Sequence, residues 1–179
     1  MSQDTPTSER TSRILDPSFL EGLDDLSTEV VRARRDETLA ERDYQSYLRR
    51  LIQARQDLLV AERDRRAVGA AEPPLVERLT QILSAGPQGG SRGEVLRVQL
   101  PPEDITEAER SVGAVMGASF LARPEALSAE DLDRMLEALD RAEHAVSAVR
   151  SAVFVVHDRL QEELKRRYRR DPSEIPSHL

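Results

Sequence analysis

Apolar residues recur at three-four spacing after Ser27, which predicts a long amphipathic helix. No Pro or Gly interrupts it before about Val68, and Gly69 and Pro73-Pro74 then end it. Two apolar registers compete along this helix. One contains Val30, Ala33, Ala40, Tyr44, Tyr47, Leu51, Ala54, Leu58 and Ala61, and the other contains Leu48, Ile52, Arg55 and Leu59. Both would be buried if the helix touches more than one neighbour.

A second long helix is predicted from Ser128, a capping residue followed by acidic residues in the first turn. Cations at 165–170 suit a helix C-terminus, and Pro172 stops the helix. Its apolar positions follow a heptad pattern typical of a coiled coil. These positions are Leu132, Met135, Leu139, Ala142, Val146, Val149, Val153, Val156 and Leu160.

The two ends of the chain are polar, and we expect residues 1–14 to be disordered and residues 171–179 to be loose. Asp16-Pro17 resembles a helix start, with Asp as the cap and Pro at the first helical position. A short amphipathic helix is expected there. Its apolar residues, which would pack on the long helices or dock a partner, are Phe19, Leu20, Leu23 and Leu26.

The connector between the long helices is expected to be loosely helical. We expect a short helix at 75–83 and a flexible Gly-rich loop at 86–93, and the weakly alternating segment at 94–100 has no strand to pair with. Another short helix is expected from Asp104 or Thr106 towards Met116.

These elements predict an all-α fold, a long antiparallel two-helix coiled coil with short accessory helices, in a single domain over residues 15–170. The connector is about long enough for the chain to turn back, which favours the antiparallel arrangement. Parallel dimerisation through both seams is the alternative.

Composition narrows the function. Charged residues are 33% and aromatic residues 3% of the chain, a balance typical of elongated helical pairs with narrow cores. The formal net charge of −7 disfavours direct DNA binding and suits a protein partner with a basic surface. The sequence has no Cys, no long apolar span and no signal-peptide pattern. We therefore expect a soluble cytoplasmic protein without membrane association.

An enzyme is poorly supported by the sequence. The three histidines, His144, His157 and His178, have no metal-ligand spacing, so no metal is expected to be required. The Gly-rich loop is followed by no helical pattern and lacks the Lys-Ser/Thr ending of a phosphate-binding loop.

Three polar residues repeat between the long helices at one constant offset of 101 residues. Ser46, Arg49 and Asp57 correspond to Ser147, Arg150 and Asp158. In the heptad of the second helix these pairs fall at b, e and f, which selects the register with Leu48, Ile52 and Leu59 in the seam. On antiparallel helices a direct repeat is related by a pseudo-twofold axis, so both sets can converge on one face.

Such a face suits a guanine nucleotide with twofold symmetry. Arg can stack on a base or donate to the O6/N7 edge of guanine or to a phosphate, and Asp can accept from the guanine N1–H and amino group. An ordinary solvated helix face with local polar pairs is the alternative explanation.

The repeated residues resemble the motif of RsiG-type anti-sigma factors, namely Glu, three residues, Ser, two, Arg, three, Gln, three, Asp, on each of two helices. Each copy matches four of the five positions. The first copy is Arg42, Ser46, Arg49, Gln53 and Asp57, and the second is Glu143, Ser147, Arg150, Phe154 and Asp158. Arg42 thus stands at the Glu position of the first copy, and Phe154 at the Gln position of the second.

The resemblance implies a function in transcription regulation during sporulation. Such proteins bind cyclic di-GMP, as a dimer, on the coiled coil, and the liganded form holds a WhiG-type sigma factor inactive. It also implies that the motif residues of this chain, except Phe154, bind the ligand. We expect the segment around Phe19–Leu26 and the outer helix faces to contact the sigma factor. A structural or adaptor coiled-coil protein without a nucleotide ligand is the alternative.

Overall fold

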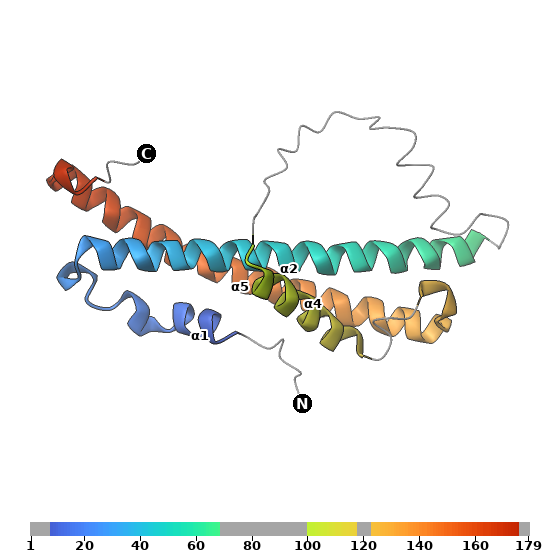
Figure 1. Cartoon of the computed structure of the whole chain (residues 1–179). Coiled ribbons are helices and arrows are strands. Elements are labelled where there is room, and N and C mark those ends of the chain that lie inside the picture. Colours follow the sequence, from blue (N-terminus) through green and yellow to red (C-terminus); the bar gives the residue numbers. More distant parts are fainter. Residues whose placement is uncertain (1–7, 69–99, 118–122, 176–179) are drawn as a thin grey trace.

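Two long helices lying side by side form the body of the molecule (Figure 1). The computed structural model describes residues 8–68, 100–117 and 123–175, and every regular element in these ranges is helical. Helix α2 spans Thr28–Val68 and helix α5 spans Ala129–Arg170. The prediction of an all-α fold built on two long helices is confirmed.

The two long helices are antiparallel. Near the start of α2, the hydroxyl of Thr28 donates to Glu174, just beyond the end of α5, at 2.5 Å. Near the end of α2, the guanidinium of Arg66 donates to the backbone oxygen of Leu127, just before the start of α5, at 2.9 Å. The predicted antiparallel arrangement is therefore confirmed.

The seam between the long helices follows the register with Leu48, Ile52 and Leu59, each at most 3% exposed. Members of the competing register lie at its edge or in solvent, apart from Tyr44, which is buried beside α4. On α5 the predicted seam positions are buried, except for the half-buried Val149, and the seam continues to Leu164.

Helix α4, which spans Pro102–Met116, packs against α2 and α5. Its buried residues Ala108 and Val112 join the apolar cluster around Tyr44 and Leu48. The helix begins slightly before the predicted Asp104 or Thr106, because Pro102 occupies its first turn, where the missing N–H has no cost.

The N-terminal segment differs from the expectation. Residues 9–15 form helix α1 (Glu9–Leu15), capped by the Ser8 side chain, where an unstructured end was expected. The following segment forms two 3₁₀ turns, η1 (Pro17–Leu20) and η2 (Leu23–Asp25), in place of one amphipathic helix. Gly22 between them adopts a left-handed conformation (φ 61°), which interrupts helical continuity.

This segment packs on the long helices as a second apolar cluster. Ile14, Phe19 and Leu23 are buried against Val153 and Leu160 of α5. Sequence reasoning missed that residues before Asp16 join this packing, because Ile14 and Leu15 are the only apolar residues between Ser8 and Asp16.

Several sequence predictions concern residues outside the described ranges. The short helix at 75–83, the Gly-rich loop at 86–93 and nearly all of the segment at 94–100 are among them. Of the tail at 171–179, the described part contains a 3₁₀ turn, η5 (Pro172–Glu174), which is held against α2 by the Thr28–Glu174 hydrogen bond.

Polar residues replace apolar ones at several seam positions of α2. Glu41 is completely buried and accepts hydrogen bonds from Arg10 (2.5 Å), Thr11 (2.5 Å) and Gln45 (2.7 Å). Arg10 also pairs with Asp104 at 3.3 Å. This network joins α1, α2 and α4, so the accessory helices are positioned by buried charge as well as by apolar packing.

Arg167 in the last turn of α5 fastens the N-terminal segment. It is 7% exposed and donates to the backbone oxygens of Leu26 (2.7 Å) and Leu23 (2.5 Å). Glu163 accepts from its Nε at 2.7 Å and balances its charge. The cations at 165–170 thus include one with a specific buried role, beyond favourable interaction with the helix dipole. No helix in the described ranges is both long and apolar enough to cross a membrane.

The seam can be tested with two valines on the same helix. Val153 is 0% exposed and Val155 is 69% exposed. We expect Val153→Ala to lower the free energy of unfolding by about 2 kcal/mol, because it removes buried methyl groups and leaves a cavity. Val155→Ala, the matched control, should change it by less than about 0.5 kcal/mol. Urea denaturation followed by circular dichroism measures both free energies. Equal losses in the two variants would contradict the placement of Val153 in the seam.

Candidate functional site

Helical spacing places most of the repeated polar residues on one face of each long helix. Arg42, Ser46, Arg49 and Gln53 are separated by four, three and four residues along α2 and therefore share a face. Glu143, Ser147 and Arg150 follow the same spacing on α5. We call these seven residues the shared polar face.

The two helices meet on this face through direct hydrogen bonds. The Nε of Arg49 donates to Glu143 Oε1 at 2.6 Å and to Ser147 Oγ at 2.9 Å. Gln53 Nε2 donates to the same carboxylate oxygen at 3.4 Å, and Ser147 Oγ donates to it at 3.1 Å. One arginine and one glutamine of the first copy thus contact the glutamate and serine of the second copy. We call these four residues the Glu143 cluster.

The cluster keeps Glu143 ionised although the residue is largely removed from water. Its side chain is 16% exposed, and burial by itself raises the pKa of a carboxyl group. Hydrogen bonds from Arg49 and Ser147 outweigh this effect and hold the pKa of Glu143 below its ordinary value. At neutral pH the cluster therefore contains a carboxylate and a guanidinium whose charges balance.

The carboxylate retains accepting capacity. All three hydrogen bonds reach Oε1, and within the described ranges none reaches Oε2. A carboxylate offers about four lone-pair sites on its two oxygens. Glu143 can therefore accept N–H donors from a ligand while it remains paired with Arg49.

The other predicted site residues are not joined across the helices. Arg42 pairs with Asp43 on its own helix at 3.2 Å, and Ser46 Oγ donates to the backbone oxygen of Arg42 at 2.8 Å. Arg150 is half-buried on the same face of α5 as Ser147, one turn further on. Since Ser147 contacts Arg49, the two repeated arginines occupy the same side of the helix pair.

The two repeated aspartates lie at the margins of the face. Asp57 and Asp158 are both exposed, each eight residues beyond the arginine of its copy. Eight residues of helix correspond to about 12 Å along the axis. Asp158 lies 3.4 Å from His157 Nδ1, its neighbour in the chain. The structure thus brings four of the nine predicted site residues together.

In the ranges that the structure describes, no group of three or more His, Cys, Asp or Glu side chains is placed to hold a metal ion. The chemistry of the shared polar face is instead that of a hydrogen-bonding surface with alternating guanidinium, carboxylate, amide and hydroxyl groups. It can recognise a polar anionic ligand with both donors and acceptors.

Among known protein families, one described as RsiG-like matches residues 17–83. Over these residues the chain is similar to that family. The RsiG-like segment begins at η1, includes the whole of α2 and contains the first copy of the motif. The second copy, on α5, lies outside it. Comparison with curated proteins and with solved structures found no match.

The RsiG-like match agrees with the resemblance found in the motif residues and extends it to the segment before α2. The family match and the cross-helix geometry are independent, because the first rests on residues 17–83 and the second requires α5.

Sequence reasoning missed the buried polar residues that support this region. Extending the heptad register by sevens from Leu48 and Ile52 reaches Glu41 and Gln45, both of which are buried. A charged residue at a core position was therefore a detectable signal. Its partners Arg10 and Thr11 were not detectable, because they come from a segment that carries little apolar pattern.

Substituting Arg49 tests which interactions set the pKa of Glu143. In Arg49→Ala the largest effect on the carboxyl, burial, still raises the pKa of Glu143, while its main opposing hydrogen bond is lost. We expect this pKa to rise, measured by carbon NMR of the carboxyl group against pH. In the unaltered protein the lowered pKa stabilises the fold above the ordinary value of 4.5, and this contribution is lost as the pH falls through the lowered value.

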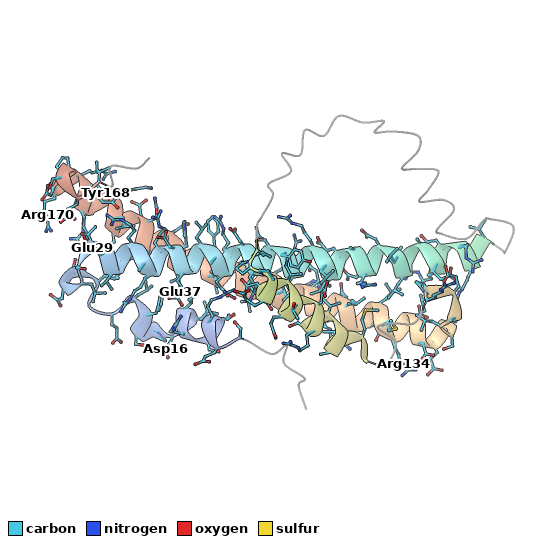
Figure 2. The ribbon with its side chains drawn as sticks, in the orientation of Figure 1. Asp16, Glu29, Glu37, Arg134, Tyr168 and Arg170 are labelled. Atoms are coloured by element: carbon cyan, nitrogen blue, oxygen red, sulfur yellow. The ribbon has the colours of Figure 1, made fainter. Side chains whose placement is uncertain are left out.

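Arg134→Ala is the control for that measurement. Arg134 is an exposed arginine paired with Asp131, near the start of α5 and remote from Tyr168 at its far end (Figure 2). An unchanged pKa of Glu143 in Arg49→Ala would show that the cross-helix contact does not govern this carboxylate.

Proposed function

We propose that this protein is a cytoplasmic anti-sigma factor that binds cyclic di-GMP on the shared polar face and thereby sequesters a WhiG-type sporulation sigma factor. The observation that carries the proposal is the contact of Arg49 with Glu143 and Ser147. It joins one copy of the motif to the other across two antiparallel helices. The RsiG-like match over residues 17–83 supports the same conclusion independently.

The residue chemistry suits a guanine nucleotide. A guanine presents an N1–H and an amino group on one edge, and Oε2 of Glu143 can accept hydrogen bonds from these donors. Its O6 and N7 atoms and the phosphates accept from the guanidinium groups of Arg49 and Arg150. The exposed Asp57 and Asp158 at the margins supply further acceptors for bases that lie along the face.

The arrangement of the two copies suits a ligand with twofold symmetry. The constant offset of 101 residues (46 to 147, 49 to 150, 57 to 158) on antiparallel helices relates the copies by a pseudo-twofold axis across the helix pair. Cyclic di-GMP has two guanines and two phosphates, and two stacked molecules preserve that symmetry. A ligand dimer would span more of the face than a single molecule and would reach the marginal aspartates.

Ligand binding would couple to the sigma factor through the stability of the helix pair. A nucleotide that contacts both helices favours the form in which they are held in register, and the sigma factor must bind that form better for the ligand to promote sequestration. The net charge of −7 complements the basic DNA-binding surfaces of a sigma factor.

The structure changes which part of the N-terminal segment can contact the sigma factor. Phe19 and Leu23 are 7% and 9% exposed and pack against α5, so they are not available for docking. Glu21 and Asp25 of the same segment are exposed and acidic. We propose that these charges and the outer helix faces, rather than the apolar residues, meet the sigma factor.

Titration calorimetry with cyclic di-GMP tests the ligand. We expect saturable binding by the unaltered protein and a loss of affinity of about tenfold or more in Arg49→Ala and in Arg150→Ala, since each removes charge-assisted hydrogen bonds. Arg134→Ala, the matched arginine control, should bind normally. A structural or adaptor protein would show no binding and no thermal shift with the nucleotide, with or without the sigma factor present.

Charge reversal tests the proposed sigma surface. In the double variant Glu21→Lys and Asp25→Lys we expect slower association with a WhiG-type sigma factor, because opposite charges no longer steer the encounter. Surface plasmon resonance at two salt concentrations measures this effect. A double reversal at Glu130 and Asp133, exposed acids at the start of α5, controls for net charge alone. Equal effects of the two reversals would show that the N-terminal segment is not part of the interface with the sigma factor.

A further inference from the structure

The repeat offset reveals that the two halves of the shared polar face differ chemically. Shifting every member of the Glu143 cluster by 101 residues gives its counterpart in the other half. Arg49 becomes Arg150 and Ser147 becomes Ser46, so the cation and the hydroxyl are retained. Glu143 becomes Arg42 and Gln53 becomes Phe154, so a carboxylate is replaced by a cation and an amide by an aromatic ring. The counterpart of the Glu143 cluster consists of Arg42, Ser46, Arg150 and Phe154.

The helix register places these counterparts opposite one another. Because the helices are antiparallel, the register that sets Arg49 against Glu143 and Ser147 also sets Arg150 against Arg42 and Ser46. The first half thus has a guanidinium facing a carboxylate, whereas the second half has a guanidinium facing a guanidinium. Two such cations on one face repel each other unless an anion lies between them.

The contacts of Arg42 and Arg150 agree with this difference between the two halves. Arg42 turns to Asp43 on its own helix, and its side chain remains 31% exposed. Arg150 makes no hydrogen bond or ion pair within the part of the chain that the structure describes. Neither guanidinium is therefore engaged across the helices, in contrast to Arg49.

Phe154 follows Arg150 by four residues, about one turn, on the same face of α5. It is 43% exposed, and its ring lies 6.2 Å from the ring of His157, tilted by 41°. Burying an aromatic ring is favourable, so a ring that remains half in solvent gains when a flat apolar surface covers it. A purine base offers such a surface, because the flat face of any base can stack on an aromatic side chain.

We propose that the two halves of the shared polar face have different tasks in binding a cyclic dinucleotide. The half with Arg42, Ser46 and Arg150 takes a phosphodiester between its two guanidinium groups, with Phe154 stacked on the adjacent purine. The half with Glu143 recognises the guanine edge through its free carboxylate oxygen. This inference rests on the proposed function and deepens it, because it assigns affinity to one half and base selectivity to the other.

The assignment treats Arg42 and Phe154 as determinants of binding rather than as losses from a symmetric motif. For one substitution, this assignment and a symmetric binding site predict opposite changes in affinity. Arg42→Glu restores the glutamate of the repeated motif. If symmetry governs binding, the affinity for cyclic di-GMP stays equal or rises. If Arg42 holds a phosphodiester, the affinity falls.

Titration calorimetry of the full chain with cyclic di-GMP decides between these outcomes. We expect Arg42→Glu to weaken binding about tenfold or more, and to reduce the sensitivity of the affinity to salt, because a screened charge pair is lost. Phe154→Gln, which restores the other motif residue, should also weaken binding, and so should Phe154→Ala. Equal or tighter binding by Arg42→Glu would overturn the inference.

Two further measurements keep the result unambiguous. Arg42→Gln removes the charge without adding a like charge beside Asp43, so it should lose affinity even if Arg42→Glu unfolds, and unchanged binding by it would equally overturn the inference. Glu143→Gln tests the other half. It should reduce the preference for cyclic di-GMP over cyclic di-AMP, whereas Arg42→Gln should weaken both ligands alike. If the unaltered protein binds no cyclic di-GMP, the proposed function itself fails; if it binds and Arg42→Glu binds equally well, only this inference fails.

Discussion

The antiparallel register of α2 and α5 is the constraint on which the rest of the structure depends. A shift of one turn would move Arg49 away from Glu143 and break the contacts of Arg167 with the N-terminal segment. Apolar seams alone specify such a register weakly, because one leucine layer can replace another. Polar residues within and beside the seam penalise the alternatives, since a misplaced buried carboxylate would have no partner.

The two sides of the helix pair differ in how their buried carboxylates are paired. Glu41 lies on the side covered by α1 and α4, where Arg10 and Asp104 complete a closed network. The Glu143 cluster lies between the two long helices alone, and its carboxylate keeps one oxygen without a hydrogen bond in the described ranges. The first arrangement satisfies both carboxylate oxygens of Glu41 within the protein and suits a structural role. The second leaves recognition capacity for another molecule.

Much of this architecture was predictable from the sequence, for physical reasons that particular residues show. The uninterrupted helix from Thr28 and the cap at Ser128 follow from local rules, and the heptad offset selected the seam containing Leu48 and Ile52. The repeat and the antiparallel arrangement led to the expectation that both copies share one face, but the contact of Arg49 with Glu143 and Ser147 was not predicted. Long-range partners were not predictable. The network of Glu41 with Arg10, and the grip of Arg167 on Leu23, join segments whose own sequences carry no sign of each other.

The contact between Arg167 and the backbone of Leu23 has a consequence for how the chain is made. The residues that cover the apolar side chains of the N-terminal segment come from the far end of α5, including Val153 and Leu160. During synthesis, Ile14 and Phe19 therefore emerge from the ribosome long before the surface that buries them. The nascent chain must therefore carry these apolar groups exposed until the C-terminal half of α5 has been translated.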